Sequence, residues 1–245
     1  MLPLIICKSH YTFLKGIHSP SELVDFARKK GVKTLCLADK NGLYGAVEFY
    51  IRCREANIQP LIATELVQDK RHVTIVARNG KGYEELCRLV TQHHLENLKI
   101  DAFPDSLNLL TLCRDPFLLQ RWLLRRKGVE RNNLFLALSL WDRESLRSLL
   151  NLLSRRSDLT RVPAVPVIEW NLLDPSDEPL RNVLRAIDLN CTVETLPEKE
   201  RFVGVKINPE EISYEPMIPG DHIARLCRLE LDLERYHLPR FIPES

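Results

Sequence analysis

Short apolar runs recur along most of the chain and alternate with segments in which apolar residues return every three or four positions. The runs are nearly continuous, which is typical of strands buried on both faces of a sheet. Seven such segments are predicted to be strands: Leu4–Cys7, Thr34–Ala38, Leu61–Thr64, Val73–Ala77, Asn108–Leu112, Leu134–Leu140 and Ala164–Ile168.

Helices are predicted between these strands. Ser19, Pro20 and Glu22 have the pattern of a capping box with proline at the first helical position, and Gly31 is placed to end that helix. Apolar residues on one face predict four further helices. These stripes are Leu43, Val47, Tyr50 and Ile51; Tyr83, Leu86, Cys87 and Val90; Leu146, Leu149, Leu150 and Leu153; and Leu180, Val183, Leu184 and Ile187.

The alternation of strands and helices predicts an α/β fold with a central parallel sheet. Seven strands favour a closed or nearly closed barrel, although the pattern by itself leaves an open sheet as the alternative. One connection is irregular, because the segment from Val67 to His72 is too short for the crossover helix that joins parallel strands.

The composition changes after about Asp188. Six prolines interrupt the remaining residues, and only Ile223–Leu233 has a helical pattern there. We interpret residues 1–189 as the barrel and residues 190–245 as an irregular C-terminal appendage that packs on it.

The overall composition indicates a folded protein. Of 245 residues, 44% are hydrophobic and 28% are charged, which excludes a disordered tail, a collagen-like rod and a coiled coil. No apolar run has the ~20 residues of a membrane helix, and Met1–Ile6 lacks the basic region of a secretory signal. Seven cysteines without a CxxC pair predict reduced thiols in a cytoplasmic protein, with Cys36, Cys87 and Cys227 in the core. The net charge of +2 is low for a protein that binds duplex DNA by itself.

Functional groups of parallel α/β folds collect at the carboxyl ends of the strands. Residues expected there are Cys7, Lys8, Ser9, His10, Asp39, Lys40, Asn41, Glu65, Cys113, Trp141, Asp142, Glu169, Trp170 and Asn171, with Lys15 close behind. A protonated lysine has no lone pair to offer a metal, and the set contains one histidine. It therefore predicts a charged site rather than a metal site. His72 is interpreted as an ordinary residue at a strand edge.

Three stretches near the N-terminus resemble the PHP (polymerase and histidinol phosphatase) domain. They are Ser9–Gly16, Ser19–Val24 and Leu37–Tyr50. The likeness is greatest to that domain at the N-terminus of bacterial DNA polymerase III alpha subunits and their error-prone relatives. Further segments that resemble it in order are Pro60–Glu65, His72–Ala77, Gly82–Leu89, Leu229–Leu233 and Leu238–Phe241. The resemblance covers nearly the whole chain and implies a distorted seven-stranded (β/α) barrel.

Active members of this family hold up to three divalent metals at the strand ends. Carried over position by position, the ligand positions fall on Ile6, Lys8, Lys15, Lys40, Glu65, Cys113, Trp141, Glu169 and Asn171. Asp39, beside Lys40, keeps the aspartate of the second motif. Most metal ligands are therefore replaced, three of them by lysine.

The resemblance implies a catalytically inactive domain, without a cofactor, that belongs or is accessory to a polymerase III alpha-type polymerase, including the error-prone, translesion type. Its role would be structural or partner-binding in DNA replication or repair. The expected partner is a polymerase core or another replication or translesion protein, with nucleic acid contacted only indirectly and no membrane. One alternative is a metal-dependent phosphoesterase or 3′–5′ exonuclease that uses Glu65, Cys113 and Glu169. Another is an anion- or phosphate-binding module that uses Lys8, Lys15 and Lys40.

Without metals, the remaining carboxylates of such a pocket would need another source of positive charge, because burying an unpaired carboxylate is costly. Asp39, Glu65 and Glu169 are the carboxylates in question. We therefore expect at least one of the three lysines, Lys8, Lys15 and Lys40, to turn inward and pair with Glu65 or Glu169.

Overall fold

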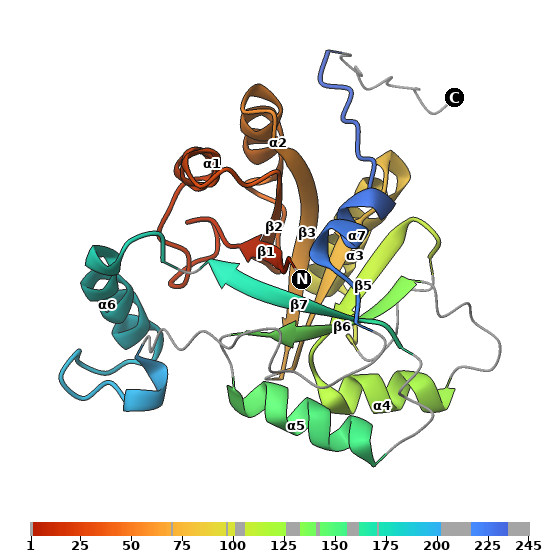
Figure 1. Cartoon of the computed structure of the whole chain (residues 1–245). Helices are drawn as coiled ribbons and strands as arrows, with labels where there is room; N and C mark the ends of the chain where they lie inside the picture. The colour runs from red at the N-terminus through yellow and green to blue at the C-terminus, as the bar shows by residue number, and fades with distance from the viewer. Residues whose placement is uncertain are drawn as a thin grey trace, which may run out of the picture.

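The computed structural model describes residues 2–69, 71–96, 98–100, 106–125, 133–140, 143–155, 162–170, 172–201 and 217–234. Within them, seven strands form a closed barrel in chain order, with the last strand paired to the first (Figure 1). The strands are β1 (Leu4–Cys7), β2 (Thr34–Lys40), β3 (Gln59–Gln68), β4 (Arg71–Ala77), β5 (Leu109–Cys113), β6 (Leu134–Ser139) and β7 (Ala164–Trp170). The predicted α/β barrel of seven strands is confirmed.

One strand of the barrel runs against the others. β4 is antiparallel to both β3 and β5, whereas the remaining neighbours pair in parallel. β3 is followed by a turn at Asp69, where φ is +49°. A connection this short cannot cross over the sheet, so the chain has to return as an antiparallel strand. The segment from Val67 to His72 is too short for a crossover helix, as the sequence indicated, and it contains the turn of the β3–β4 hairpin.

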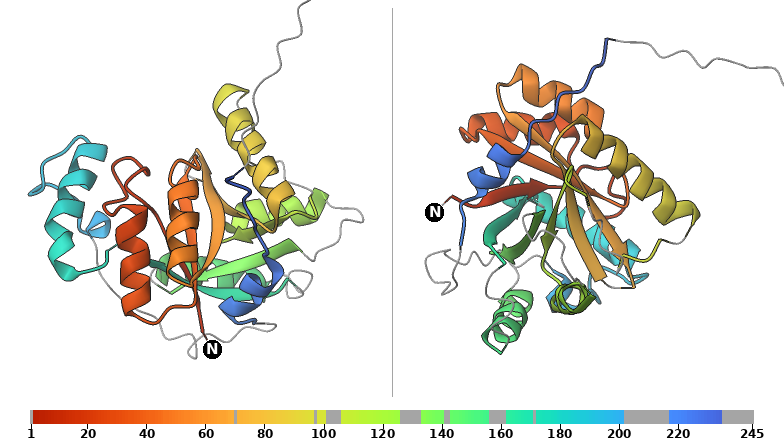
Figure 2. Two further views of the ribbon diagram at one scale, coloured as in Figure 1. Left: turned by 90° about the horizontal axis from the view of Figure 1, so that it is seen from above. Right: turned by 90° about the vertical axis from the view of Figure 1, so that its right-hand side faces the viewer.

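Helices surround the barrel. Those described are α1 (Pro20–Lys29), α2 (Ala46–Glu55), α3 (Gly80–Leu95), α4 (Pro116–Arg125), α5 (Arg143–Ser154), α6 (Glu178–Asp188) and α7 (Gly220–Leu226), with short 3-10 turns at Pro175–Asp177 and Glu198–Glu200. Figure 2 shows α1 beside α2 on one flank and α4 beside α5 on another. α6 lies to one side, beyond the carboxyl end of β7 (Figure 1). None of the helices in the described part of the chain is long and apolar enough to cross a membrane.

The predicted start and end of α1 are both found. The hydroxyl of Ser19 accepts a hydrogen bond from the backbone N–H of Glu22 at 3.2 Å, and the Glu22 carboxylate accepts one from the N–H of Ser19 at 2.7 Å. Gly31, one residue beyond the C-cap, has a φ of +69°. Glycine adopts this left-handed conformation without the steric cost that other residues incur.

Two predicted helix faces differ from the structure. In α2 the buried residues are Ala46, Phe49, Tyr50 and Cys53, whereas Val47 and Ile51 are 41% and 39% exposed. The helix is apolar on more than one side, and its fit to α1 and the barrel selects the side that is buried. In α3, Leu86 is buried but Cys87 is exposed, so placing Cys87 in the core was wrong.

The apolar stripe of α6 also faces away from the core. Leu180, Val183 and Ile187 are 50%, 42% and 58% exposed, and Ala186 is buried in their place. By contrast, the stripe of α5 packs as its spacing indicates, with Leu146, Leu149 and Leu153 buried. Amphipathic spacing identified both helices, but it could not tell which one would pack on the barrel.

Alternate residues of each strand fill the barrel interior. This interior cluster contains Leu4 and Ile6, Cys36 and Ala38, Leu61 and Ala63, Val76, Leu110 and Leu112, Phe135 and Ala137, and Val165 and Val167. The intervening residues face the surrounding helices. Side chains alternate between the two faces of a strand. A residue two positions beyond an interior residue therefore also points into the barrel.

The C-terminal part of the described chain packs against the amino-terminal end of the barrel. Ile223 and Cys227 belong to the interior cluster, and the side-chain amide of Gln59 donates to the carbonyl oxygens of Ala224 and Cys227 at 2.8 and 2.9 Å. A Cβ atom at Gly220 would lie 2.3 Å from the Leu4 nitrogen, so this close approach requires glycine. The helix here is α7, which is earlier and shorter than the predicted Ile223–Leu233. The polymerase-like segment Leu238–Phe241 lies outside the described residues.

Candidate functional site

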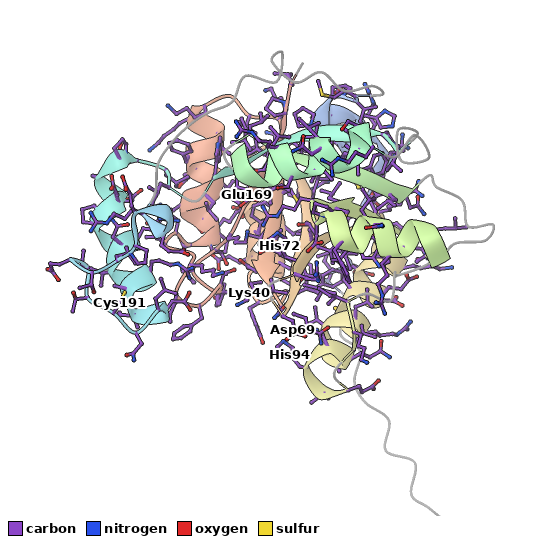
Figure 3. The ribbon with its side chains drawn as sticks, turned by 90° about the horizontal axis from the view of Figure 1, so that it is seen from below. Lys40, Asp69, His72, His94, Glu169 and Cys191 are labelled. Atoms are coloured by element: carbon purple, nitrogen blue, oxygen red, sulfur yellow. The ribbon has the colours of Figure 1, made fainter. Side chains whose placement is uncertain are left out.

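The inward register of the strands gathers six ionisable side chains at one end of the barrel. They are Lys8, Lys40, Glu65, His72, Arg114 and Glu169, each two or four positions along its strand from an interior residue. β4 is reversed, so its residue near the start, His72, lies at the same end as the carboxyl ends of the parallel strands. Figure 3 shows Lys40, His72 and Glu169, from β2, β4 and β7, at this end.

Four of these side chains form one network of ion pairs. The Lys8 ammonium lies 3.2 Å from a carboxylate oxygen of Glu65 and 3.7 Å from one of Glu169. The Arg114 guanidinium donates to Glu65 at 2.6 Å through one nitrogen and to Glu169 through another. Each carboxylate therefore contacts both cations. All four side chains are at most 18% exposed, so water screens these charges little.

The network keeps both carboxylates ionised. Burial alone would raise the pKa of Glu65, but the charges of Lys8 and Arg114 outweigh burial and lower it to about 2. The pKa of Glu169 is likewise lowered by Arg114 and Lys8 against the effect of burial. The pKa of Lys8 is raised because Glu65 and Glu169 outweigh its desolvation. Two positive and two negative charges thus compensate each other within the barrel.

His72 is at the site rather than being an ordinary strand-edge residue, and its interpretation from sequence is corrected here. Burial, reinforced by the charge of Arg114, lowers the pKa of His72. The imidazole is therefore neutral at pH 7. It adds a polar wall to the site without disturbing the balance of charge.

The residues present do not fit a metal cluster of the PHP type. Lysine and arginine offer no lone pair, and the carboxylate oxygens of Glu65 and Glu169 already face Lys8 and Arg114. Ile6 lies in the apolar interior. Over the described part of the chain, no three His, Cys, Asp or Glu side chains are arranged to hold a metal ion. Trp141 and Asn171, the two other candidate positions, lie outside the described residues.

Cys113 is separated from the site by the register of β5. Leu110 and Leu112 point inward, so Arg114 does too, while Cys113 packs in the outer core beneath the helices. Burial raises the pKa of its thiol to about 12, and the thiol donates to the carbonyl oxygen of Asp115 at 3.4 Å. A thiol that stays protonated is a poor metal ligand and nucleophile. Sequence reasoning named Cys113 and missed its neighbour Arg114, which strand alternation could have found.

The Asp39 carboxylate binds groups of a loop through hydrogen bonds and, among the described residues, does not pair with a lysine. It is buried, and its carboxylate accepts hydrogen bonds from the backbone N–H of Ser9 at 2.7 Å and from the hydroxyls of Ser9 and Thr12, both at 2.8 Å. These bonds fix the segment between β1 and α1. Neither Lys15 nor Lys40 lies within ion-pair distance of a carboxylate among the residues that the structure describes.

Beside the network lies a cavity of about 250 Å³. Residues of three segments line it. The β1–α1 loop contributes Leu14 and Lys15, and the β3–β4 hairpin contributes Val67 and His72. Arg181 and Arg185 come from α6, and Glu200 comes from the 3-10 turn after that helix. Sequence reasoning missed the two arginines. Their four-residue spacing on the side of α6 away from the apolar stripe is a signal, but nothing local indicates that this helix reaches the barrel mouth.

Comparison with known proteins gives a consistent result. Residues 6–115 match the family model of the PHP domain. The chain is 25% identical to the DNA polymerase III subunit alpha of Mycoplasma genitalium, over 91% of this chain and 26% of that protein. It is 27% identical to the error-prone DNA polymerase of Hahella chejuensis, over 98% of this chain and 25% of that protein. The chain thus spans about a quarter of the length of these relatives.

Shorter matches are closer in sequence. The error-prone DNA polymerase of an Anaeromyxobacter species is 37% identical over 94 residues, which is 36% of this chain and 8% of that protein. Among solved structures, a putative metal-dependent phosphoesterase from Bifidobacterium adolescentis is 24% identical over 52% of this chain and 46% of that one, with a TM-score of 0.27. A TM-score this low supports no argument about function.

Replacing Lys8 should reveal the energetic coupling of the network. In Lys8→Met, Arg114 would be the remaining cation of the network for both Glu65 and Glu169. We expect the free energy of unfolding to fall by roughly 3–5 kcal/mol, because removing one partner of a buried ion pair leaves the other charge uncompensated. Urea denaturation at pH 7 measures the change. Lys40→Met is the matched control, with an expected change within about 0.5 kcal/mol. Equal losses in the two variants would contradict the assigned role of Lys8.

The network also predicts how stability depends on pH. The ordinary pKa of a glutamate is 4.5, whereas that of folded Glu65 is about 2. Between these values the unfolded chain binds more protons, so acidification favours unfolding. Glu65 should contribute on the order of 3 kcal/mol at neutral pH, and this stability should be lost between about pH 4.5 and pH 2. Denaturation at a series of pH values should give a shallower acid dependence for Glu65→Gln than for the unchanged chain; identical slopes would refute this contribution.

Proposed function

We propose that this chain serves a DNA polymerase III alpha-type polymerase without catalysing a reaction itself. The proposal is supported by the match of residues 6–115 to the PHP domain and by the similarity of the chain to DNA polymerase III alpha subunits and error-prone DNA polymerases. The role of the chain is structural or partner-binding, in DNA replication or in translesion synthesis and repair. It acts in the cytoplasm, its partner is the polymerase core or another replication or translesion protein, and nucleic acid is contacted through that partner.

The observation that carries the absence of catalysis is the ion-pair network. Lys8 and Arg114 supply the positive charge that Glu65 and Glu169 require, at 2.6 and 3.2 Å for the two contacts to Glu65. A metal ion would have to displace both cations before it could reach these oxygens. The cations cannot replace its chemistry, because neither can bind and activate a water molecule as a divalent metal does. They supply only its electrostatic role.

The exposed face of α6 supports the partner-binding part of the proposal. Leu180, Val183 and Ile187 lie on one face of the helix at 42–58% exposure, and the exposed Leu189 and Val193 follow. Exposed apolar patches of this kind mark interaction sites. In the relatives, about three quarters of the polymerase lies outside the matched region. A polymerase III alpha-type chain is therefore the occupant we propose for this face.

The same proposal includes the domain organisation. Residues 1–189 would be the barrel, and residues 190–245 an appendage on it. In support, Met217 forms a bridge with Ala164 of β7, α7 packs on the amino-terminal end of the barrel, and the N–H of Leu231 donates to the hydroxyl of Tyr50 at 3.2 Å.

An assay for hydrolysis tests the inactivity. The chain is incubated with bis-p-nitrophenyl phosphate or a 5′-labelled single-stranded oligonucleotide, each with millimolar Mg²⁺, Mn²⁺ or Zn²⁺. We expect no product above that of a matched Glu65→Gln/Glu169→Gln variant, and no change of melting temperature with metal or chelator. Metal-dependent cleavage that disappears in the double variant would favour the phosphoesterase or exonuclease alternative.

A binding experiment tests the partner role. The chain is mixed with the polymerase III alpha-type chain of the same organism, and complex formation is followed by size-exclusion chromatography and titration. Val183→Glu would bury an unpaired carboxylate in the apolar interface, so affinity should fall by about tenfold or more. The control is Val47→Glu on α2, because Val47 has nearly the same exposure as Val183. No complex, or equal weakening by both variants, would contradict the proposal.

A further inference from the structure

Three aromatic side chains are exposed on the loops at the carboxyl ends of β1 and β2. Tyr11 and Phe13 belong to the β1–α1 loop and Tyr44 to the β2–α2 loop, and they are 44%, 81% and 67% exposed. Because β1 and β2 are paired in parallel, the two loops leave the barrel next to each other. In the described part of the chain one further aromatic residue is exposed, Phe117, and the Arg71 guanidinium lies 3.6 Å from its ring centroid.

The two loops come into contact at Gly45. A Cβ atom at Gly45 would lie 3.2 Å from a ring carbon of Tyr11, so the Tyr11 ring lies against the residue that follows Tyr44. The Tyr44 ring lies over Gly42, where a Cβ atom would be 2.5 Å from it. Phe13 follows Tyr11 by two residues in the same loop. We call Tyr11, Phe13 and Tyr44 the aromatic rim.

The loop that carries Tyr11 and Phe13 is fixed by hydrogen bonds. Between these two residues, Thr12 turns inward, and its hydroxyl donates to the Asp39 carboxylate at 2.8 Å. The backbone N–H of Gly16 donates to the carbonyl oxygen of Thr12 at 2.9 Å. A Cβ atom at Gly16 would lie 1.7 Å from a backbone oxygen of the same loop, so the loop can close this tightly only with glycine.

The loop that carries Tyr44 is fixed as well. The side-chain amide of Asn41 donates to the carbonyl oxygen of Val67 at 3.2 Å and accepts from the N–H of Val67 at 2.7 Å. The backbone N–H of Asn41 donates to the carbonyl oxygen of Glu65 at 2.9 Å, and a ring nitrogen of His94 lies 2.6 Å from the carbonyl oxygen of Asn41. Aromatic rings presented by fixed loops lose little conformational entropy when a ligand binds.

The two loops carry no carboxylate of their own. Residues 8–19 and 40–47 contain no aspartate or glutamate. Their lysines add little attraction for an anion, since Lys8 is paired within the network and the charge of Asp188 acts on Lys15. Contact with a ligand would therefore depend on the rings rather than on net charge. Carboxylates of the adjoining elements have partners: Asp39 binds Ser9 and Thr12, Glu22 binds Ser19, Glu48 binds Ser21, and Asp177 pairs with His18.

We propose that the aromatic rim binds single-stranded nucleic acid by stacking with unpaired bases. Every base has an aromatic face, so stacking on Tyr and Phe side chains tolerates any sequence. In a duplex the same faces are covered by neighbouring bases, and the low net charge of the chain disfavours duplex binding. This contact is direct and additional to those made through the polymerase partner. It goes beyond the proposed polymerase role and does not depend on it.

Comparing strands with and without bases tests the stacking. A short fluorescein-labelled oligothymidylate is titrated with the unchanged chain, and binding is followed by fluorescence anisotropy. An abasic strand with the same number of phosphates and a duplex of the same length are titrated in parallel. We expect saturable binding of the oligothymidylate and at least about tenfold weaker binding of the abasic strand, because stacking supplies most of the affinity.

Substitutions of the rim test the residues. Phe13→Leu and Tyr44→Leu keep an apolar side chain but remove the ring, and each should weaken binding by at least about fivefold. Phe13→Tyr keeps a ring and should bind as the unchanged chain does. Leu107→Ala is the matched control, because Leu107 is as exposed as Tyr44 and precedes the start of β5, at the opposite end of the barrel. It should leave binding unchanged.

The possible outcomes differ clearly. Absence of saturable binding, equal affinity for the abasic strand, or unchanged binding in both leucine variants overturns the proposal. Leucine variants that weaken the complex with the polymerase III alpha-type chain but not oligonucleotide binding would assign the rim to a protein interface and also overturn it. Saturable binding that needs bases and rings supports it, and a comparison with oligouridylate then identifies DNA or RNA as the preferred strand. Failure to bind the polymerase chain would contradict only the proposed polymerase role.

Discussion

In a closed barrel, successive side chains of every strand must point alternately to the interior and to the surrounding helices. The site of this protein is a consequence of that constraint. Interior positions continue from Ile6 to Lys8, from Leu112 to Arg114 and from Val167 to Glu169. Charged residues at these positions cannot avoid one another, because their strands converge on one opening. Two cations and two carboxylates in alternation satisfy the constraint with little net charge.

The network has limits that follow from the same physics. Desolvating four charged groups offsets much of their mutual attraction, so an apolar set of equal volume could be as stable. The network does, however, fix the geometry of the opening, because each carboxylate is bound from two sides. Asp39 does the same for the adjacent loop through Ser9 and Thr12. Asp39 therefore has a structural role in this protein.

The sequence was most informative where the physics is local. Continuous apolar runs located all seven strands, the capping box located α1, and a connection too short to cross over pointed to the hairpin. The packing of the helices on the barrel was harder to predict from the sequence. Spacing alone did not show that α2 buries Phe49 rather than Val47, or that the stripe of α6 faces outward. Arg181 and Arg185 reach the opening because of how α6 is placed, for which the sequence holds no local signal. The alternation of inward and outward side chains along β5 would have identified Arg114, whereas the resemblance to the family motif selected Cys113.

Closure of the barrel depends on the pairing of β1 with β7, which joins Leu4 to Val167 across most of the chain. The match to the PHP family model ends at residue 115, after the fifth strand. A fragment cut there would leave β1 and β5 as open edges, with unpaired backbone groups and interior side chains exposed to water. The residues after 115 supply β6 and β7 and so complete the barrel. In such an architecture, no strand of the circle can be omitted, because each one covers the edges of its two neighbours.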